Sequence, residues 1–162
     1  MASVTSAGIL LFRWAGDEPE VLLGHMGGPF WSGKDDAAWS IPKGIYADDE
    51  EPLAAALREF TEELGLAPPF EVEALHPLGE LRQPSGKRLT VWAAEGDLDP
   101  AEIVPGTFTM EWPPRSGKTA DFPEIDRAKW WPVDEARVKL VKGQRPFLDR
   151  LLQLVSLLRG DA

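Results

Sequence analysis

The chain has 162 residues, 43% of them hydrophobic and 27% charged, a balance typical of one globular domain. Its formal net charge of −10 excludes the broad basic surface that duplex nucleic acid requires, so we expect no such partner. The lack of cysteine excludes disulfides and thiolate metal sites.

The sequence predicts neither a membrane span nor a secretion signal. The longest apolar runs, residues 8–12 and 151–158, are far shorter than a bilayer crossing, and the N-terminus has no basic region followed by an apolar stretch. We therefore expect a cytoplasmic protein with no membrane partner. Most of its acidic residues need no role beyond solubility, but an anionic ligand would require a cation or local Lys and Arg residues to offset the repulsion.

The N-terminal part of the chain predicts strands separated by polar turns. Apolar runs indicate strands at residues 4–14 and 21–24, joined by a turn at 15–19. Residues 27–36 are rich in Gly, Pro and Asp and predict a loop, which leads into a short strand at 39–42.

A helix is predicted over residues 52–64. Four acidic residues precede it and favour a helix N-terminus, Pro52 suits its first turn, and Gly65 ends it. Apolar side chains recur along it at helical spacing and predict one stripe that anchors the helix in a core. The residues of this stripe are Leu53, Leu57, Phe60 and Leu64.

The second half of the chain begins with a predicted hairpin, formed by residues 71–81 and 87–94 about a turn at 83–86. Residues 95–126 contain several prolines and predict an irregular insertion, which large apolar side chains keep ordered.

A last strand is predicted near Trp130 and Trp131, followed by an amphipathic helix over about 145–158. Neither a repeat nor a second domain is indicated, so residues 1–162 are expected to form one domain. Strands that surround one or two helices predict an α/β (α+β) sandwich.

Three glutamates on the predicted helix indicate where the chemistry lies. Glu59, Glu62 and Glu63 stand at i, i+3 and i+4, so we expect their carboxylates to share one face that points away from the apolar stripe. Like charges at this spacing repel mildly, and a hard divalent cation such as Mg²⁺ removes that penalty. Taken alone, however, three glutamates are more often a solvated helix face.

Residues 44–66 resemble the Nudix box at every defined position. The matching residues are Gly44, Glu50, Arg58, Glu59, Phe60, Glu62, Glu63, Gly65 and Leu66. The resemblance extends outside the box. Residues 39–44 are similar to the strand and turn that enter the box in many members, and residues 108–130 are similar to a branch of predicted NTP pyrophosphohydrolases in the same family.

The resemblance implies a Nudix-type α/β/α sandwich with a mixed sheet, in which the box forms a loop-helix-loop. It implies attack by water on a phosphorus of a nucleoside diphosphate derivative, with Mg²⁺ or Mn²⁺ as the cofactor. Glu59, Glu62 and Glu63 are the implied metal ligands, joined by the backbone carbonyl of Lys43. Glu59 is also the implied base.

Other positions of the box are implied to support these ligands. Arg58 and Glu50 resemble the pair that braces the loop and orients Glu59. Gly44 and Gly65 are implied to be structural.

Outside the box, Glu124 lies six residues before Trp130, a spacing similar to that of a late acidic residue in some members. It is a candidate metal ligand or base, although a loop acid without a role fits the sequence equally well. Our hypothesis is that the insertion at 95–126 folds over the metal face and delivers Glu124 to it.

The substrate is expected to be a small nucleotide-like diphosphate, either a nucleoside triphosphate or a dinucleoside polyphosphate. Lys43, Arg82, Lys87 and Arg88 are candidate phosphate contacts. Four tryptophans are candidates for stacking on a base, although a tryptophan at any one of these positions is more often a core residue. They are Trp31, Trp39, Trp92 and Trp112.

Two rival functions use the same fold. A catalytically silent nucleotide-binding sensor would be expected to have lost box glutamates, and this chain keeps them all. An isoprenoid diphosphate isomerase would be expected to use a cysteine, which is absent. The sequence leaves the oligomeric state open.

Overall fold

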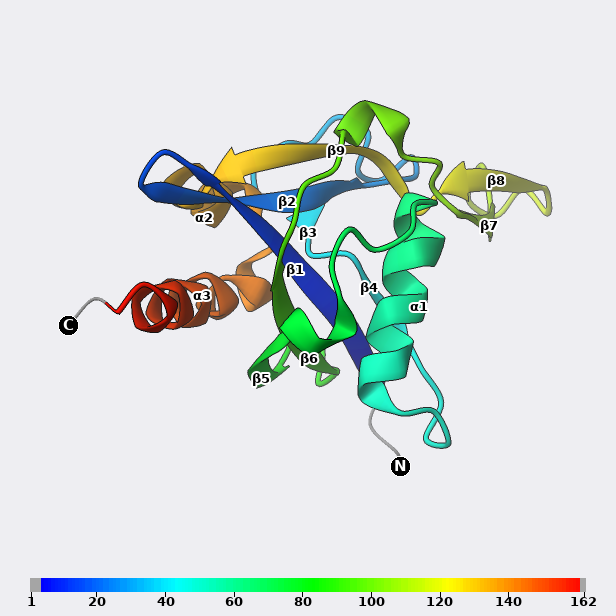
Figure 1. The fold of residues 1–162 in the computed structure, drawn as a ribbon. Helices are drawn as coiled ribbons and strands as arrows, with labels where there is room; N and C mark the ends of the chain where they lie inside the picture. Colours follow the sequence, from blue (N-terminus) through cyan, green and yellow to red (C-terminus); the bar gives the residue numbers. More distant parts are fainter. Residues whose placement is uncertain (1–3, 161–162) are drawn as a thin grey trace.

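The computed structural model describes residues 4–160, which form a mixed seven-stranded sheet, a separate two-stranded hairpin and three α-helices (Figure 1). The strands and α-helices are, in chain order, β1 (Thr5–Ala15), β2 (Glu18–Met26), β3 (Trp39–Ser40), β4 (Lys43–Ile45), α1 (Pro52–Leu64), β5 (His76–Arg82), β6 (Arg88–Glu95), β7 (Thr107–Glu111), β8 (Thr119–Pro123), β9 (Ile125–Pro132), α2 (Val133–Lys139) and α3 (Pro146–Leu158). Short 3-10 turns lie at Val72–Ala74, Pro100–Glu102 and Lys142–Gln144.

Strand β1 is the centre of the sheet. Along one edge it pairs with β6, in parallel, and along the other it pairs with β4 near its start and with β2 near its end, both antiparallel. Strand β2 continues the sheet to β3 and β9. Because β1 is covered on both faces, it is a nearly continuous apolar run rather than an alternating one.

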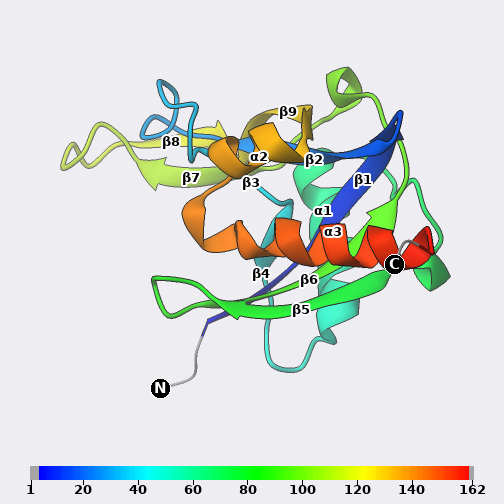
Figure 2. The same ribbon diagram turned by 90° about the vertical axis from the view of Figure 1, so that its left-hand side faces the viewer.

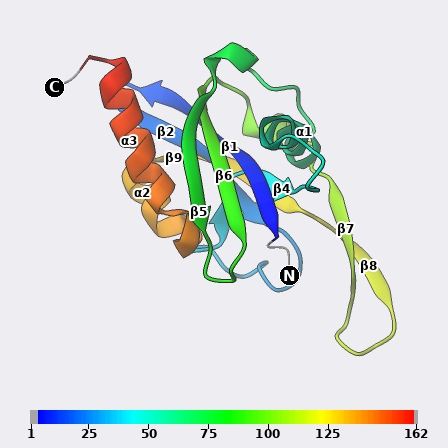
Figure 3. The same ribbon diagram turned by 90° about the horizontal axis from the view of Figure 1, so that it is seen from below.

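Helices cover both faces of the sheet, so the chain forms three layers (Figures 2 and 3). Ile9 and Leu11 of β1 pack with Phe60 of α1 on one face. Leu10 and Phe12 point to the opposite face and belong to the core formed with α2 and α3. The predicted α/β/α sandwich with a mixed sheet is confirmed.

Helix α1 has the bounds that the sequence predicted. Gly65 ends it in the left-handed conformation (φ 67°), and its N–H donates to the carbonyl of Thr61 at 2.7 Å. A side chain at this position would also collide with the chain after β6, since a Cβ would lie 2.1 Å from the carbonyl oxygen of Val104.

The prediction that residues 95–126 are irregular was wrong. Strands β7 and β8 form a regular antiparallel hairpin in this segment, and the hairpin extends beyond the body of the domain (Figure 3). Exposed and half-buried side chains alternate along Thr107–Glu111, the period of a strand with one covered face. The prolines that suggested irregularity, Pro113 and Pro114, lie in the turn between the two strands.

Several other boundaries differ from the expectation. The strand predicted from residue 71 begins at His76, because a 3-10 turn precedes it, and the last strand starts earlier, at Ile125. The sequence analysis missed β4 and α2. Helix α2 has acidic residues in its first turn and basic residues in its last, a pattern that was available in the sequence. None of the helices formed by residues 4–160 is both long and apolar enough to span a bilayer.

Candidate functional site

A cavity of about 500 Å³ lies where α1 packs against β4, and three carboxylates line it. Glu59 and Glu63 come from α1, and Glu124 comes from the link between β8 and β9. Lys43 of β4 also lines this cavity, which we call the acidic pocket. The structure therefore brings together four of the predicted site residues from three separate segments.

Glu59 lies directly against the backbone of Gly44. A Cβ at position 44 would lie only 1.9 Å from the Cδ of Glu59, so any side chain there would displace the carboxylate. Strand β4 is held in place by antiparallel pairing with β1, in which Gly44 is opposite Ala7. The glycine of the box thus allows the helix to bring its glutamate close to the strand.

Glu63 is buried in the site, with 9% of its surface exposed, and Glu59 is buried to the same degree, with 8% exposed. The backbone N–H of Lys43 donates to its Oε2 at 3.1 Å. The pKa of Glu63 is raised to about 8, mainly by burial and in smaller part by the nearby Glu124 and Glu59 carboxylates, whereas Lys43 opposes the shift. The metal-free pocket therefore favours a protonated Glu63 near neutral pH.

Burial also raises the pKa of Glu59, and the hydrogen bond from Arg58 opposes this effect. The negative charges of Glu62 and Glu124 add to the increase. Both buried glutamates thus lack enough positive charge around them, which is the electrostatic condition that a bound cation would relieve.

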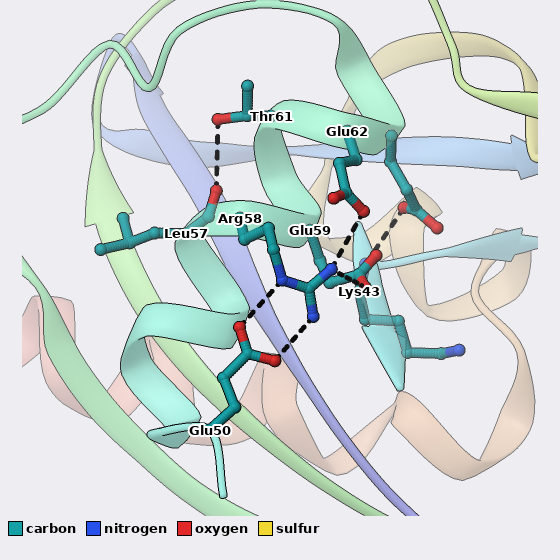
Figure 4. A network of polar contacts seen from close by, with 8 residues as sticks. Lys43, Glu50, Leu57, Arg58, Glu59, Thr61 and Glu62 are labelled. Atoms are coloured by element: carbon teal, nitrogen blue, oxygen red, sulfur yellow. Dashed lines mark hydrogen bonds and ion pairs between the residues drawn. The ribbon is translucent and has the colours of Figure 1, made fainter. Parts of the chain in front are cut away.

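Arg58 connects the helix to the loop before it (Figure 4). Its Nε and Nη2 donate to the two carboxylate oxygens of Glu50, each at 2.8 Å, and its Nη1 donates to Glu59 at 2.8 Å and to Glu62 at 3.0 Å. The hydrogen bonds from Arg58 lower the pKa of Glu50. The pairing of Arg58 with Glu50 that the resemblance implied is present, and the same guanidinium reaches Glu59.

The expectation that the face of the three box glutamates points away from the buried side of the helix was wrong for two of them. Glu59 and Glu63 face the sheet beside the buried Ala56 and Phe60, whereas the side chain of Glu62 is 57% exposed and binds Arg58 outside the acidic pocket. The buried face of α1 is shifted from the predicted stripe, because Ala55 and Ala56 are buried whereas Leu53 and Leu57 are only partly buried.

The donor set suits a hard divalent cation, which prefers carboxylate and carbonyl oxygens. Within residues 4–160, no three His, Asp or Glu side chains are close enough together to hold a metal ion. The Arg58 guanidinium occupies one oxygen of Glu59 and one of Glu62. Glu59, Glu63 and Glu124 nevertheless line one pocket and are mutually destabilised there, so the residues fit a cation that draws them together.

Backbone hydrogen bonds fix the position of Glu124. Its carbonyl accepts from the N–H of Gly27 at 3.0 Å, and its own N–H donates to the carbonyl of Gly106 at 2.8 Å. Phe108 of the adjoining β7 also lines the acidic pocket. The insertion therefore contributes to one wall of the pocket, while the rest of the hairpin extends outwards.

The sequence analysis missed a contact between a buried histidine and an aspartate beside this wall. His25 of β2 is fully buried, with Nδ1 2.9 Å from the Asp126 carboxylate and Nε2 2.6 Å from the carbonyl oxygen of Lys34. It thereby ties the loop that carries Trp31 to the start of β9, next to Glu124. Nothing in the sequence marked this histidine, since it lies in the otherwise apolar stretch at residues 21–26 of β2.

The predicted substrate contacts are only partly brought together. Lys43, Lys87 and Arg88 line a second cavity, of about 570 Å³, whereas Arg82 lines neither this cavity nor the acidic pocket. Of the four candidate tryptophans, Trp31 alone lines both cavities. A smaller cavity of about 290 Å³, between the β1–β2 turn and α3, contains none of the predicted site residues.

The other three tryptophans have structural surroundings. Trp39 is 2% exposed in the core on the α3 side. Trp92 packs against the core on the α1 side, and Trp112 makes an edge contact with Phe30 beside the hairpin.

Comparison with known proteins agrees with this geometry. A family model described as the NUDIX domain matches residues 3–151. The C. elegans Ap4A hydrolase binary complex is a similar solved structure, with 19% identity, a TM-score of 0.61 and coverage of 94% of this chain and 98% of that chain. No curated protein matches the chain.

Two further structures share the fold. The NUDIX domain of Shewanella oneidensis NrtR, cocrystallised with ADP ribose, has 17% identity and a TM-score of 0.63 over 96% of this chain and 90% of that chain. A mutT/nudix family protein from Listeria innocua has 16% identity and a TM-score of 0.63 over 98% of both chains.

The family model spans most of the chain and the box is complete. The chain therefore belongs to the NUDIX domain family, and its set of box residues is that of the family's hydrolases, which act on pyrophosphate bonds.

Proposed function

We propose that the protein hydrolyses a diphosphate linkage in a nucleoside diphosphate derivative, with Mg²⁺ or Mn²⁺ as its cofactor. The observation that carries the proposal is the acidic pocket itself. Two buried box glutamates, Glu59 and Glu63, line the same cavity as Glu124 and Lys43. Buried carboxylates with this little compensating charge are costly to a fold, and a divalent cation with phosphate oxygens explains their presence.

The cation would be held by Glu59, Glu63 and Glu124, together with the backbone carbonyl of Lys43. Glu62 would join them once its side chain leaves Arg58. When bound, the cation polarises the phosphoryl oxygens and neutralises the charge that develops on the leaving phosphate.

Glu59 is the proposed base. Arg58 donates to its Oε1, while Oε2 has no hydrogen-bond donor among residues 4–160 and is available to the attacking water. Glu59 takes a proton from this water as the water oxygen bonds to phosphorus. The bridging P–O bond then breaks, and its electron pair departs with the leaving phosphate. The raised pKa of Glu59 brings it closer to the range in which a general base works best at neutral pH.

The substrate class follows from the cavities on either side of Lys43. The acidic pocket accommodates the cleaved linkage, and the adjoining cavity provides Lys87 and Arg88 for phosphate and Trp31 for a flat ring. A nucleoside triphosphate or a dinucleoside polyphosphate fits this division. The similar structures named for Ap4A hydrolase and cocrystallised with ADP ribose support a nucleotide-like ligand.

A panel of nucleoside diphosphate derivatives, screened with Mg²⁺ for released phosphate, tests the proposal. Glu59→Gln and Glu63→Gln should each reduce kcat about 100-fold or more, with unchanged circular dichroism. Glu73→Gln removes the same charge from an exposed turn outside both cavities and should retain full activity. Full activity of the two box variants would contradict the site.

The alternative function is a sensor that binds a nucleotide without cleaving it. Tight, metal-dependent binding of one member of the panel without any product would support the sensor over the hydrolase. The complete set of box glutamates favours the hydrolase.

A further inference from the structure

The second cavity, of about 570 Å³, adjoins the acidic pocket, because Met26, Trp31 and Lys43 line both. Its other walls are the β5–β6 turn and the short segment that leads into α3. We call it the basic cavity. Its volume lies within the range of small-molecule binding sites, roughly 300–1,000 Å³.

Every charged residue that lines the basic cavity is a cation. They come from separate segments and are Lys43, Lys87, Arg88 and Lys142. In the whole chain, 27 acidic residues outnumber 17 basic ones, so a cavity wall without a single Asp or Glu is not what scattered surface charge would produce. The positive charge is therefore concentrated next to the pocket that concentrates the negative charge.

These cations are also largely free to bind a ligand. Within residues 4–160, the ammonium groups of Lys43, Lys87 and Lys142 make no hydrogen bond or ion pair, and Arg88 has only a distant contact with Glu80 at 3.9 Å. Elsewhere, cations such as Arg13 and Lys139 are paired with carboxylates.

The two segments that form the outer walls of the basic cavity are hydrogen-bonded to each other. Gln83 of the β5–β6 turn donates from Nε2 to the carbonyl of Gly143 at 3.0 Å. Gln144, which is 2% exposed, donates to Ser40 Oγ at 3.0 Å and accepts from the N–H of Ile41 at 2.9 Å. These hydrogen bonds therefore hold together the two segments that carry Lys87 and Lys142.

We propose that the basic cavity binds a phosphate-rich group of the substrate, beyond the two phosphates of the cleaved linkage. The substrate class is then a molecule with at least one further phosphate beyond the cleaved diphosphate, such as a dinucleoside polyphosphate. A nucleoside diphosphate that is linked to an uncharged sugar would leave these cations without a partner. The assignment of substrate rests on the proposed hydrolase function, whereas the binding of a polyphosphate by the cavity does not.

The binding test uses the full chain in excess EDTA, titrated with inorganic tripolyphosphate in a calorimeter. Tripolyphosphate should bind at one saturable site, and the double variant Lys87→Ala with Lys142→Ala should weaken that binding at least about tenfold. Lys118→Ala is the matched control, because it removes an exposed lysine of the β7–β8 hairpin that lines neither cavity. Its affinity should stay within about twofold of the wild type.

Three results would overturn the proposal: no saturable binding, unchanged affinity in the double variant, or an equal loss in Lys118→Ala. The activity test then compares substrates. The double variant should raise KM about tenfold for a dinucleoside polyphosphate and by a clearly smaller factor for a nucleoside diphosphate sugar. Equal effects on both substrates would refute the specificity. Absence of all hydrolysis, with the binding result intact, would refute the proposed function alone.

Discussion

Replacing Gly44 with alanine places a methyl group where the Glu59 carboxylate lies. The added Cβ would be 1.9 Å from Cδ and 2.0 Å from Oε2, whereas ordinary van der Waals contact begins at 3.4 Å. Either the carboxylate or strand β4 must therefore move by about 1.5 Å. A misplacement of about 1 Å at a catalytic group costs on the order of 100-fold in rate, so we expect kcat to fall by at least that factor.

Steady-state kinetics with Mg²⁺ and the best substrate of the panel would measure this loss, together with Mn²⁺ affinity by calorimetry. Gly33→Ala is the matched control. A Cβ at position 33 would have no atom within 4 Å, and Gly33 lines neither cavity. The control should keep its kcat and its Mn²⁺ affinity, whereas Gly44→Ala should lose both.

Chemical denaturation separates a local effect from unfolding. Gly44→Ala should remain folded, with a loss of about 1 kcal/mol as the hydrogen bond from Arg58 to Glu59 is disturbed. If Gly44→Ala kept its kcat and a crystal structure showed Glu59 unmoved, the close approach of strand and carboxylate would have no catalytic consequence. The reasoning would then be refuted.

Three further predictions concern the charges around this contact. Because the folded-state pKa of Glu63 is raised from 4.5 to about 8, the metal-free protein should lose stability as pH rises from about 4.5 to about 8, by roughly 1 kcal/mol per pH unit. Urea denaturation should show this decline in the wild type and not in Glu63→Gln, and calorimetry in buffers of different ionisation enthalpy should show proton release on Mg²⁺ binding at pH 7. Arg58→Ala should lower kcat by misorienting Glu59, and it should reduce the free energy of unfolding by about 1 kcal/mol because the ion pair with Glu50 is lost. If stability were unchanged and only KM rose, Arg58 would instead be a phosphate contact. Glu124→Gln should lower kcat more than it raises KM and should weaken Mn²⁺ binding, and equal Mn²⁺ affinity in variant and wild type would remove Glu124 from the metal site.

Features set by neighbouring residues could be read from the sequence. Helix α1 begins at Pro52 and ends before Gly65 as predicted, because a proline in the first turn and a glycine after the last act on the local backbone. The pairing of Arg58 with Glu50 also followed from the box, since the two residues stand at a fixed spacing across the start of the helix.

Features that depend on how distant segments pack could not be read in this way. The difference between the buried Glu63 and the exposed Glu62 depends on which face of α1 packs against the sheet, and the periodicity of the helix did not predict that face correctly. Strand β7 was missed because the nearby prolines outweighed the alternation of Thr107–Glu111, and its partner β8 follows only after a turn.

The tertiary structure also decided which charges meet. Lys142 follows Lys87 by more than fifty residues, and the contact between Gln83 and Gly143 holds their segments together. His25 and Asp126 are likewise neighbours only because β2 pairs with β9. The sequence alone determined the family, the box helix and the acids that it carries, because these depend on residue types at short spacings. The acidic pocket and the basic cavity beside it exist only after the sheet has brought remote segments together, since burial and charge pairing are set by distances in space.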